Sequence, residues 1–405
     1  MPPQPFRRLR PRLSVPFPRP GRSRSRTVLA ATLLLGALST VATGGAAADG
    51  AEPTGPPPAP TGPPAPTETA AATETATPTG AAVPTETPAP TEAPAPMQTA
   101  PPTAPAAPAA PAVPAVPDFW VDPDSAAVRQ VAQWQREGRT ADARLVERIA
   151  ARPQAVWLYG SGPEATVGSH VEAAAKAGRT AVFVAYFIPH RDCGAYSSGG
   201  ARDAAEYRRW IEEFASGLGT RGAYVIVEPD AVAQLVAGCP RADAAERYAL
   251  LAHAVQRLKR QPHTKVYLDA GNAGWIPDER RLLDPLRRAG IAEADGFALN
   301  VSNHHTDEVS SAYGHRLVKE LGGDKHFVID SSRNGNGPYA GDQAWCNPPG
   351  RALGRPPTAE TGDPALDAYL WIKRPGESDG PCRGGPRAGQ WWPEYALGLA
   401  RRARS

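Results

Sequence analysis

The chain has 405 residues, with 44 lysines and arginines against 41 aspartates and glutamates, a formal net charge of +3. Residues 1–48 hold eight of the arginines and no acidic residue, so the remaining chain carries 36 basic against 41 acidic residues, a net charge of about −5. A net negative chain without runs of like charge argues against nucleic acid or an anionic membrane as a partner.

The first 48 residues have the order of a secretory signal peptide. A basic region from Arg7 to Arg26 precedes an apolar stretch, Val28 to Val41, and three small residues at 46–48. The apolar stretch is short for a permanent span, so we expect removal near Ala48, by the general secretory or the twin-arginine route. An uncleaved membrane anchor is the alternative. The mature protein is expected to be secreted, without membrane contact.

Residues 49–117 are rich in proline, threonine, alanine and glutamate, as in PTETPAPTEAPAP. Such a segment cannot bury enough apolar surface to offset its chain entropy, and proline stiffens it. It is predicted to be a disordered, semi-rigid linker. Residues 118–405 then remain as one domain large enough for a barrel-sized core.

In that domain, seven short β-branched or aromatic runs alternate with stretches of helical composition. Buried strands separated by helices predict an α/β fold with a parallel sheet, open or closed. The predicted strands are 155–159, 180–187, 223–229, 265–270, 296–301, 326–330 and 369–373. The predicted helices include 165–177, 201–217, 243–260, 279–289 and 307–321.

Polar residues follow six of the seven predicted strands. In a β/α barrel the loops after the strands converge on one face, where active sites lie, so these side chains should form one cluster. An isolated aspartate after a strand is equally typical of a helix N-cap or turn. The polar groups are His190–Asp192, Glu228–Asp230, Asp269–Asn272, Asn300–Asn303, Asp330–Asn334 and Lys373–Asp379.

Carboxylates without a matching histidine and cysteine set favour acid–base chemistry over metal chemistry. His304–His305 lacks the spacing of a helical zinc motif, and no phosphate-binding loop, dinucleotide fingerprint or G-x-S-x-G elbow occurs. We therefore expect no cofactor and no metal. A metal-dependent phosphoesterase is the alternative, and it would lose activity with a chelator.

Aromatic residues at or beyond the strand ends supply a second feature of the expected site. Flat aromatic rings suit the apolar C–H faces of sugars. For any single tryptophan the alternative is core packing, which we expect for Trp120 and Trp210. The candidate sugar platforms are Trp157, Tyr186, Trp275, Trp345 and Trp391–Trp392.

Seven segments, in order across essentially all of residues 118–405, resemble glycoside hydrolase family 6. This resemblance implies a distorted seven-stranded parallel β/α (TIM-like) barrel that hydrolyses β-1,4-glucosidic bonds with inversion at the anomeric carbon. The segments are YFIPHRDCGA (186–195), IVEPDAVA (226–233), YLDAGNAGW (267–275), FALNVSN (297–303), FVIDSSRNGNGP (327–338), WCNPPGRALG (345–354) and LWIKRPGESDG (370–380).

The resemblance also implies catalytic roles. Asp230 matches the general acid that protonates the departing oxygen, and Asp192 matches a second aspartate that raises the pKa of the acid and interacts with the attacking water. Asp379 matches the proposed base, although a chain of waters could relay that proton instead. Inversion requires room for water, so acid and base should stand roughly 6.5–9.5 Å apart.

Nine further residues are expected to bind the substrate. In the family pattern a histidine usually stands where this chain has Asn272, which can hydrogen-bond to sugar hydroxyls but cannot titrate. This difference bears on affinity and on the preferred glucan. The nine residues are Trp157, Tyr186, Asp269, Asn272, Trp275, Asn303, Trp345, Lys373 and Glu377.

Four cysteines in an exported chain predict two disulfides, and spacing leaves three connectivities open. The resemblance selects Cys193–Cys239 and Cys346–Cys382, each joining loops on the active face. A disulfide of this kind typically adds about 2–4 kcal/mol to stability. Free buried thiols are the alternative.

The sequence thus predicts a secreted, monomeric endo-β-1,4-glucanase with a β-1,4-glucan as its partner. The short catalytic part, without long insertions near the site, favours an open groove and attack within chains. A processive cellobiohydrolase is the first alternative. The second is a non-catalytic, wall-associated glycan-binding protein.

Overall fold

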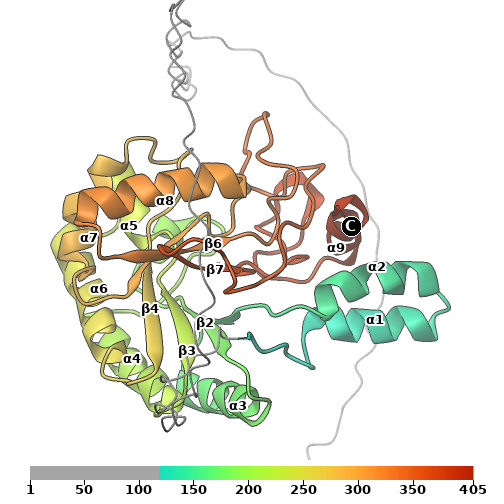
Figure 1. Cartoon of the computed structure of the whole chain (residues 1–405), viewed down its shortest axis with the longest axis horizontal. Helices are drawn as coiled ribbons and strands as arrows, with labels where there is room; N and C mark the ends of the chain where they lie inside the picture. Colours follow the sequence, from blue (N-terminus) through green and yellow to red (C-terminus); the bar gives the residue numbers. More distant parts are fainter. Residues whose placement is uncertain (1–117, 405) are drawn as a thin grey trace, which may run out of the picture. The chain divides into compact units, whose positions relative to one another are not determined.

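The computed structural model describes residues 118–404 (Figure 1), so the predicted signal peptide and linker lie outside the described residues. Seven parallel strands form one sheet in the order β1 to β7, each strand hydrogen-bonded to the next along the chain. The predicted α/β class and seven-stranded parallel arrangement are confirmed. The strands are β1 (Val156–Leu158), β2 (Ala181–Ala185), β3 (Ala223–Val227), β4 (Thr264–Asp269), β5 (Gly296–Leu299), β6 (His326–Asp330) and β7 (Leu366–Leu370).

Helices connect each strand to the next, except β6 to β7, and cover the outer face of the sheet (Figure 1). Several begin at residues whose side-chain oxygens accept a hydrogen bond from the first turn, such as Asp203, Asp243 and Thr306. The helices are α1 (Ala126–Arg136), α2 (Thr140–Ala150), α3 (Pro163–Lys176), α4 (Ala204–Leu218), α5 (Ala231–Ala237), α6 (Ala244–Leu258), α7 (Leu283–Arg288), α8 (Asp307–Leu321) and α9 (Pro393–Arg402). Short 3₁₀ turns occur at Asp192–Gly194, Glu279–Leu282 and Cys382–Gly384. Within residues 118–404, none of the helices has the length and apolar character needed to cross a membrane.

The strands are apolar on both faces because both faces are buried. In β2, Phe183 and Ala185 belong to the core between the sheet and its helices, whereas Val182 and Val184 belong to a second core on the inner face. Alternate residues of a strand point to opposite faces, which explains this division. The sheet curls so that its inner face encloses the second core.

The curled sheet does not continue as a β ladder from β7 to β1 within the described residues. Two contacts nevertheless join its edges. Ala155 N donates to Trp371 O at 3.0 Å, and the Trp157 indole Nε1 donates to Ile372 O at 2.7 Å. The fold is therefore a distorted barrel, as the resemblance to glycoside hydrolase family 6 implied.

Helices α1, α2 and α9 pack together beside the barrel (Figure 1). Trp391 and Trp392 belong to this third cluster, and the Trp391 indole donates to Gln130 Oε1 at 3.0 Å. The structure therefore places these two half-buried residues in the cluster beside the barrel, whereas we expected sugar platforms near the strand ends. Their position in the sequence did not reveal that Trp391 bonds to α1.

The seventh strand is displaced from its predicted position. We expected 369–373, whereas the strand is Leu366–Leu370. Asp367 interrupts the apolar run, which hid the true start of the strand from its composition. The ladder between β6 and β7 ends at Leu370. Beyond it, Lys373 N donates to the side chain of Asp330 at 2.9 Å and not to a backbone carbonyl of β6.

Asp367 is the centre of a polar network near the amino ends of β4, β6 and β7. Its carboxylate accepts from the Tyr267 hydroxyl, from His326 Nδ1 at 2.7 Å and from Lys265 Nζ at 3.0 Å. Burial raises the pKa of this carboxyl, but the three hydrogen bonds outweigh it and lower the pKa. This end of a barrel typically serves stability and not chemistry.

We expect Asp367→Asn to lower the free energy of unfolding by about 2 kcal/mol at pH 7, because an amide cannot accept from all three donors. A carboxyl whose pKa is lowered by folding stabilises above its unfolded pKa of about 3.9, and that contribution is lost as the pH falls. The difference from wild type should therefore shrink towards pH 3 in urea unfolding. An equal difference at pH 7 and pH 3 would contradict the electrostatic explanation.

Candidate active site

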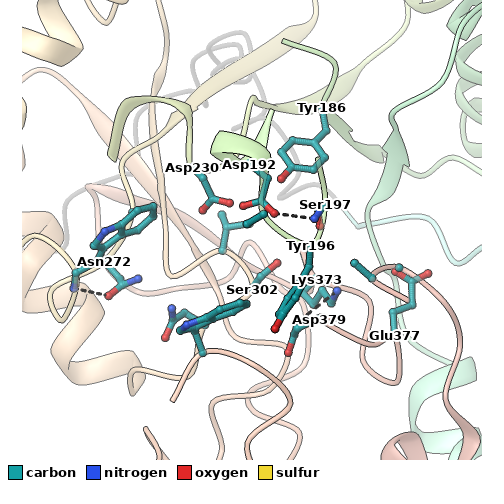
Figure 2. A pocket seen from close by; sticks show the side chains of 18 of the residues that line it. Tyr186, Asp192, Tyr196, Ser197, Asp230, Asn272, Ser302, Lys373, Glu377 and Asp379 are labelled. Carbon is teal, nitrogen blue, oxygen red and sulfur yellow. Dashed lines mark hydrogen bonds and ion pairs between the residues drawn. The ribbon is translucent and has the colours of Figure 1, made fainter. Parts of the chain in front are cut away.

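A cleft of about 1140 Å³ lies at the carboxyl ends of the strands. Figure 2 shows Asp192 and Asp230 side by side, and Tyr196, Lys373 and Asp379 together in another part of the cleft. The predicted residues that line the cleft are Trp157, Tyr186, Asp192, Asp230, Asn272, Trp275, Asn303, Trp345, Lys373, Glu377 and Asp379. The structure therefore brings together every predicted catalytic residue and eight of the nine predicted substrate-binding residues.

Asp269 is the exception, since it lies behind the cleft wall at the end of β4 and is only 1% exposed. Its Oδ1 accepts from Asp230 N at 2.9 Å and from Gly271 N at 3.1 Å. Burial raises the pKa of this carboxyl to about 7. The structure thus places Asp269 against the backbone of Asp230 and not in contact with the cleft.

Asp230 directly precedes α5 and has a left-handed backbone, with φ of 72°. Non-glycine residues seldom adopt this conformation, and they concentrate at functional sites. Burial raises the pKa of its carboxyl well above the usual value, and the neighbouring carboxylates Asp269 and Asp192 raise it further, while Lys373 opposes them. This carboxyl therefore retains its proton to a higher pH than an ordinary aspartate.

Asp192 lies in the loop after β2 and also has a left-handed backbone, with φ of 54°. Its Oδ2 accepts from Ser197 N at 2.7 Å, and its Oδ1 accepts from Gln234 Nε2 at 3.3 Å. Burial raises the pKa of its carboxyl, although these hydrogen bonds and the charge of Arg191 counteract it. Arg191 also donates to the carbonyls of Ser197 and Tyr186, which fixes the loop to β2.

Asp379 is held on the opposite side of the cleft by two cations. Its Oδ2 accepts from Arg333 NH1 at 2.8 Å and from Asn347 N at 3.0 Å, and its Oδ1 lies 3.4 Å from Lys373 Nζ. Burial favours the neutral acid, but the charges of Arg333 and Lys373 prevail and lower the pKa to about 2. Asp379 is therefore ionised at neutral pH.

Aromatic side chains form much of the cleft wall. Trp157 and Tyr186 pack edge to face with ring centroids 5.2 Å apart, and the Trp157 indole is fixed by its bond to Ile372 O. Trp345 is 46% exposed and Trp275 is 36% exposed, so both present open faces to the cleft. Trp210 is buried and Trp120 packs against the main core, as predicted.

Asn272 has a local structural task as well as a place in the cleft. Its Oδ1 accepts from Gly274 N and Trp275 N, both at 3.0 Å, and so closes the turn that carries Trp275. A side-chain oxygen that caps a turn in this way is typical of asparagine. The Nδ2 group is then the part of this side chain that remains to meet a ligand.

Asn303 and Glu377 complete the predicted set. Asn303 Oδ1 accepts from His304 N at 3.0 Å, which orients its amide. Glu377 lies in the loop after β7, where one carboxylate oxygen is 2.9 Å from Arg374 Nε. Both side chains are thus fixed by neighbours in their own loops.

The structure contains both disulfides selected by the resemblance, Cys193–Cys239 and Cys346–Cys382. The first joins the Asp192 loop to the segment after α5. The second joins the loop of Trp345 to the turn just after Asp379. Each bridge therefore restrains a loop that carries a candidate catalytic residue.

Three residues of the site were missed by sequence reasoning as individual candidates. Arg333 could have been found, because a buried aspartate after β7 needs a cation and Arg333 follows β6. Tyr196 lies in the Asp192 loop, and its ring is 5.8 Å from that of Trp345. It also covers Gly380, where a Cβ would lie 2.5 Å from the ring. Gln234 is one helical turn beyond Asp230, a spacing that puts both on one side of α5.

Comparison with known proteins relates the whole described region to one family. The model for glycosyl hydrolases family 6 matches residues 115–403. Endoglucanase A of Cellulomonas fimi is 45% identical over 290 residues, covering 71% of this chain and 61% of that protein. Endoglucanase A of Thermobispora bispora is 43% identical over 291 residues, covering 70% and 62%. The chain thus spans about three fifths of the length of these two relatives.

A solved structure shows the same architecture. The endoglucanase Cel6 from Mycobacterium tuberculosis, in complex with methyl-cellobiosyl-4-deoxy-4-thio-β-D-cellobioside, superposes with a TM-score of 0.65 at 44% sequence identity. The match covers 71% of this chain and 98% of that chain.

Proposed function

This chain belongs to family 6 of the glycosyl hydrolases, and from that membership we propose that it is an endoglucanase that hydrolyses β-1,4-glucosidic bonds within glucan chains. The observation that carries the proposal is the placement of Asp230 and Asp192 together opposite Asp379 in an aromatic cleft. The two curated relatives named above are endoglucanases, which supports attack within chains.

Asp230 is the proposed general acid. Protonation of the departing sugar oxygen needs a carboxyl that is still protonated near neutral pH, and the raised pKa of Asp230 meets that need. Asp192 is the proposed helper, since its negative charge contributes to that raised pKa. Asp269 acts from behind, by charge and by its bond to Asp230 N.

Asp379 is the proposed base for the attacking water. Its Oδ2 is occupied by Arg333 and Asn347, so Oδ1 is the oxygen that remains to accept a proton. A pKa of about 2 makes this carboxylate a weak acceptor in the free enzyme. Proton transfer to it is therefore favoured only as the transition state forms, with intervening water carrying the proton.

Attack by water on the face opposite the departing oxygen inverts the anomeric carbon, so the first product from a β-glucan should be the α anomer. The exposed rings of Trp275 and Trp345 offer stacking surfaces for the sugars. Their exposure supports an open groove that an internal chain segment can enter from the side. A processive enzyme would need this groove to be covered along its length.

The test of this function is to follow a solution of carboxymethylcellulose by viscometry and by reducing-end assay together. An endoglucanase should lower the viscosity of the solution rapidly while it forms few new reducing ends, and ¹H NMR should show the α anomer first. Slow thinning with mainly cellobiose released would favour the processive alternative. Release of the β anomer first would overturn the inverting assignment.

Secretion is proposed with this function. Two disulfides favour an oxidising compartment outside the cytoplasm, and the basic and apolar order of residues 1–48 is that of an export signal. Residues 49–117 are proposed to be a linker between that signal and the catalytic domain. N-terminal sequencing of the protein from culture medium, beginning near residue 49, would support both statements.

A further inference from the structure

The loop that carries Asp192 has an unusual backbone that needs support from its surroundings. His190, Asp192 and Cys193 have φ of 55°, 54° and 48°, all in the left-handed region. Three such residues within four positions persist only where neighbouring groups hold them. Arg191 and the disulfide hold the loop from the cleft side and from α5, respectively.

Arg247 of α6 holds the same loop from behind. It is only 3% exposed, and its NH2 donates to Pro189 O at 3.0 Å and to His190 O at 2.9 Å. No carboxylate of the described residues lies within 4.0 Å of this guanidinium, although the charge of Glu228 acts on it. A buried arginine whose direct partners are carbonyl oxygens serves to fix backbone.

A second nitrogen of Arg247 holds a side chain of the cleft. Its NH1 donates to Gln234 Oε1 at 3.4 Å, and Gln234 Nε2 donates to Asp192 Oδ1 at 3.3 Å. Arginine can only donate, so the glutamine oxygen must face Arg247 and its NH2 group must face Asp192. The orientation of this amide therefore follows from the donor on Arg247 and the acceptor on Asp192, because the oxygen and the NH2 group of a glutamine have nearly the same shape.

We propose that Gln234 and Arg247 are positioning residues, in which Arg247 orients the Gln234 amide so that its N–H group holds Asp192 as a carboxylate beside Asp230. This proposal rests on the function proposed above and extends it to two residues that act through Asp192 and take no part in the proposed proton transfers. A donor to an ionised carboxylate favours the charged form of that group. The charge of Asp192 in turn disfavours ionisation of Asp230.

Several other charged or polar groups also act on Asp192 and Asp230. The chain of hydrogen bonds from Arg247 through Gln234 to Asp192, here called the relay, acts in addition to them. Asp192 is influenced by burial, by Ser197 N and by Arg191, in addition to Gln234. Asp230 is influenced by burial, Asp269 and Lys373, in addition to Asp192. Burial raises the pKa of the Tyr186 hydroxyl, and the nearby charges of Asp230 and Asp192 raise it further. Gln234 is the only side-chain amide among these groups, so it can be altered without changing the charge of the site.

The first experiment compares Gln234→Met with Gln234→Glu in the full chain. Loss of one donor to a carboxylate should lower kcat about tenfold in Gln234→Met with KM nearly unchanged. The acidic limb of the pH profile should move up by about one unit, because Asp192 then ionises less readily. Gln234→Glu keeps the shape and the bond to Arg247 but places a second carboxylate beside Asp192, so its loss should be larger.

A role in packing alone predicts the reverse order, since glutamate is nearly isosteric with glutamine. That order, or an unmoved acidic limb in both variants, would overturn the proposal. Gln256→Met is the matched control, because Gln256 of α6 also donates to a carboxylate, Glu293, but on the exposed surface. Its kcat and pH profile should equal those of wild type.

The second measurement does not depend on activity. Titration of the Asp192 carboxyl carbon by ¹³C NMR, assigned with Asp192→Asn, should give a higher pKa in Gln234→Met than in wild type, and a higher one also in Arg247→Lys. A lysine has a single compact ammonium and lacks the planar fork with which Arg247 reaches the two carbonyls and the amide from separate nitrogens. An unchanged pKa in both variants would overturn the relay even if the wild-type chain proved to hydrolyse another polymer. Failure of the proposed function appears separately, as absent hydrolysis by wild type.

Discussion

Asp230→Ala should lower kcat on cellulose by about 10³-fold while cello-oligosaccharide binding persists. The alkoxide that leaves from a glucan is a poor leaving group, so its departure should depend on a proton from the proposed acid, Asp230. The side chain is at the cleft wall, and the aromatic surfaces that bind sugar lie on other loops. Isothermal titration with cellotetraose measures the retained binding, and reducing-end release measures the lost turnover.

A substrate whose leaving group needs little protonation provides a direct control for the acid role of Asp230. A cello-oligosaccharide with a 2,4-dinitrophenyl leaving group needs little protonation, so Asp230→Ala should lose far less activity on it. Asp284→Ala is the matched control, because Asp284 is exposed on α7 and should leave turnover unchanged. Equal losses on both substrates would contradict the acid role. Binding without hydrolysis by wild type would instead favour the glycan-binding alternative.

Arg333→Met should lower the free energy of unfolding by about 3–5 kcal/mol at pH 7. Arg333 is fully buried, and its guanidinium bonds to Asp379 and to Ser302 O. Removing it leaves the carboxylate of Asp379 in a buried site with Lys373 as its remaining cation. Urea unfolding of the full chain, followed by tryptophan fluorescence, measures the loss.

The pH dependence of that loss follows from the pKa of Asp379, which is about 2 in the folded chain and about 3.9 in an unfolded one. A pKa lowered by folding stabilises above about pH 3.9, here by about 2–3 kcal/mol, and this contribution disappears as the pH falls towards 2. The variant should therefore approach wild-type stability in acid. A loss that does not depend on pH would assign the effect of Arg333 to packing.

A double variant separates the ion pair from its burial. Arg333→Met combined with Asp379→Leu removes both charges of this pair but leaves Lys373 without its carboxylate, so it should recover only part of the stability lost in Arg333→Met alone. Turnover should stay low in the double variant because the proposed base is absent. Full turnover with recovered stability would remove Asp379 from the mechanism.

Much of the site was predictable because parallel strands impose a rule that the sequence displays. Polar residues that directly follow buried strands must meet at one end of the barrel, so Asp192, Asp230 and Asp379 could be placed together before any coordinates. The collinear resemblance then implied a separate role for each of the three. It also selected the two disulfide pairings, which spacing had left open.

Predictions failed where a distant segment decides the environment of a residue. Asp269 is the last residue of β4 and Asp230 follows β3, so both lie at carboxyl ends of strands, yet the side chain of Asp269 turns back to the Asp230 N–H group. Trp391 was expected to lie with Trp345, but it bonds to Gln130 of α1 and does not line the cleft. The seventh strand began earlier than expected because Asp367, polar in composition, is neutralised by partners from β4 and β6.

By itself, the sequence determined the α/β class, the seven strands and the set of acids at their ends, because periodicity and strand-end chemistry are local properties of the chain. Tertiary structure alone decided the charge states within that set. Asp230 is buried beside other carboxylates, which raises its pKa, whereas Asp379 is buried beside the cations Arg333 and Lys373, which lower its pKa. The pKa of a carboxyl depends on groups that folding brings within a few ångströms, and chain order does not specify those distances.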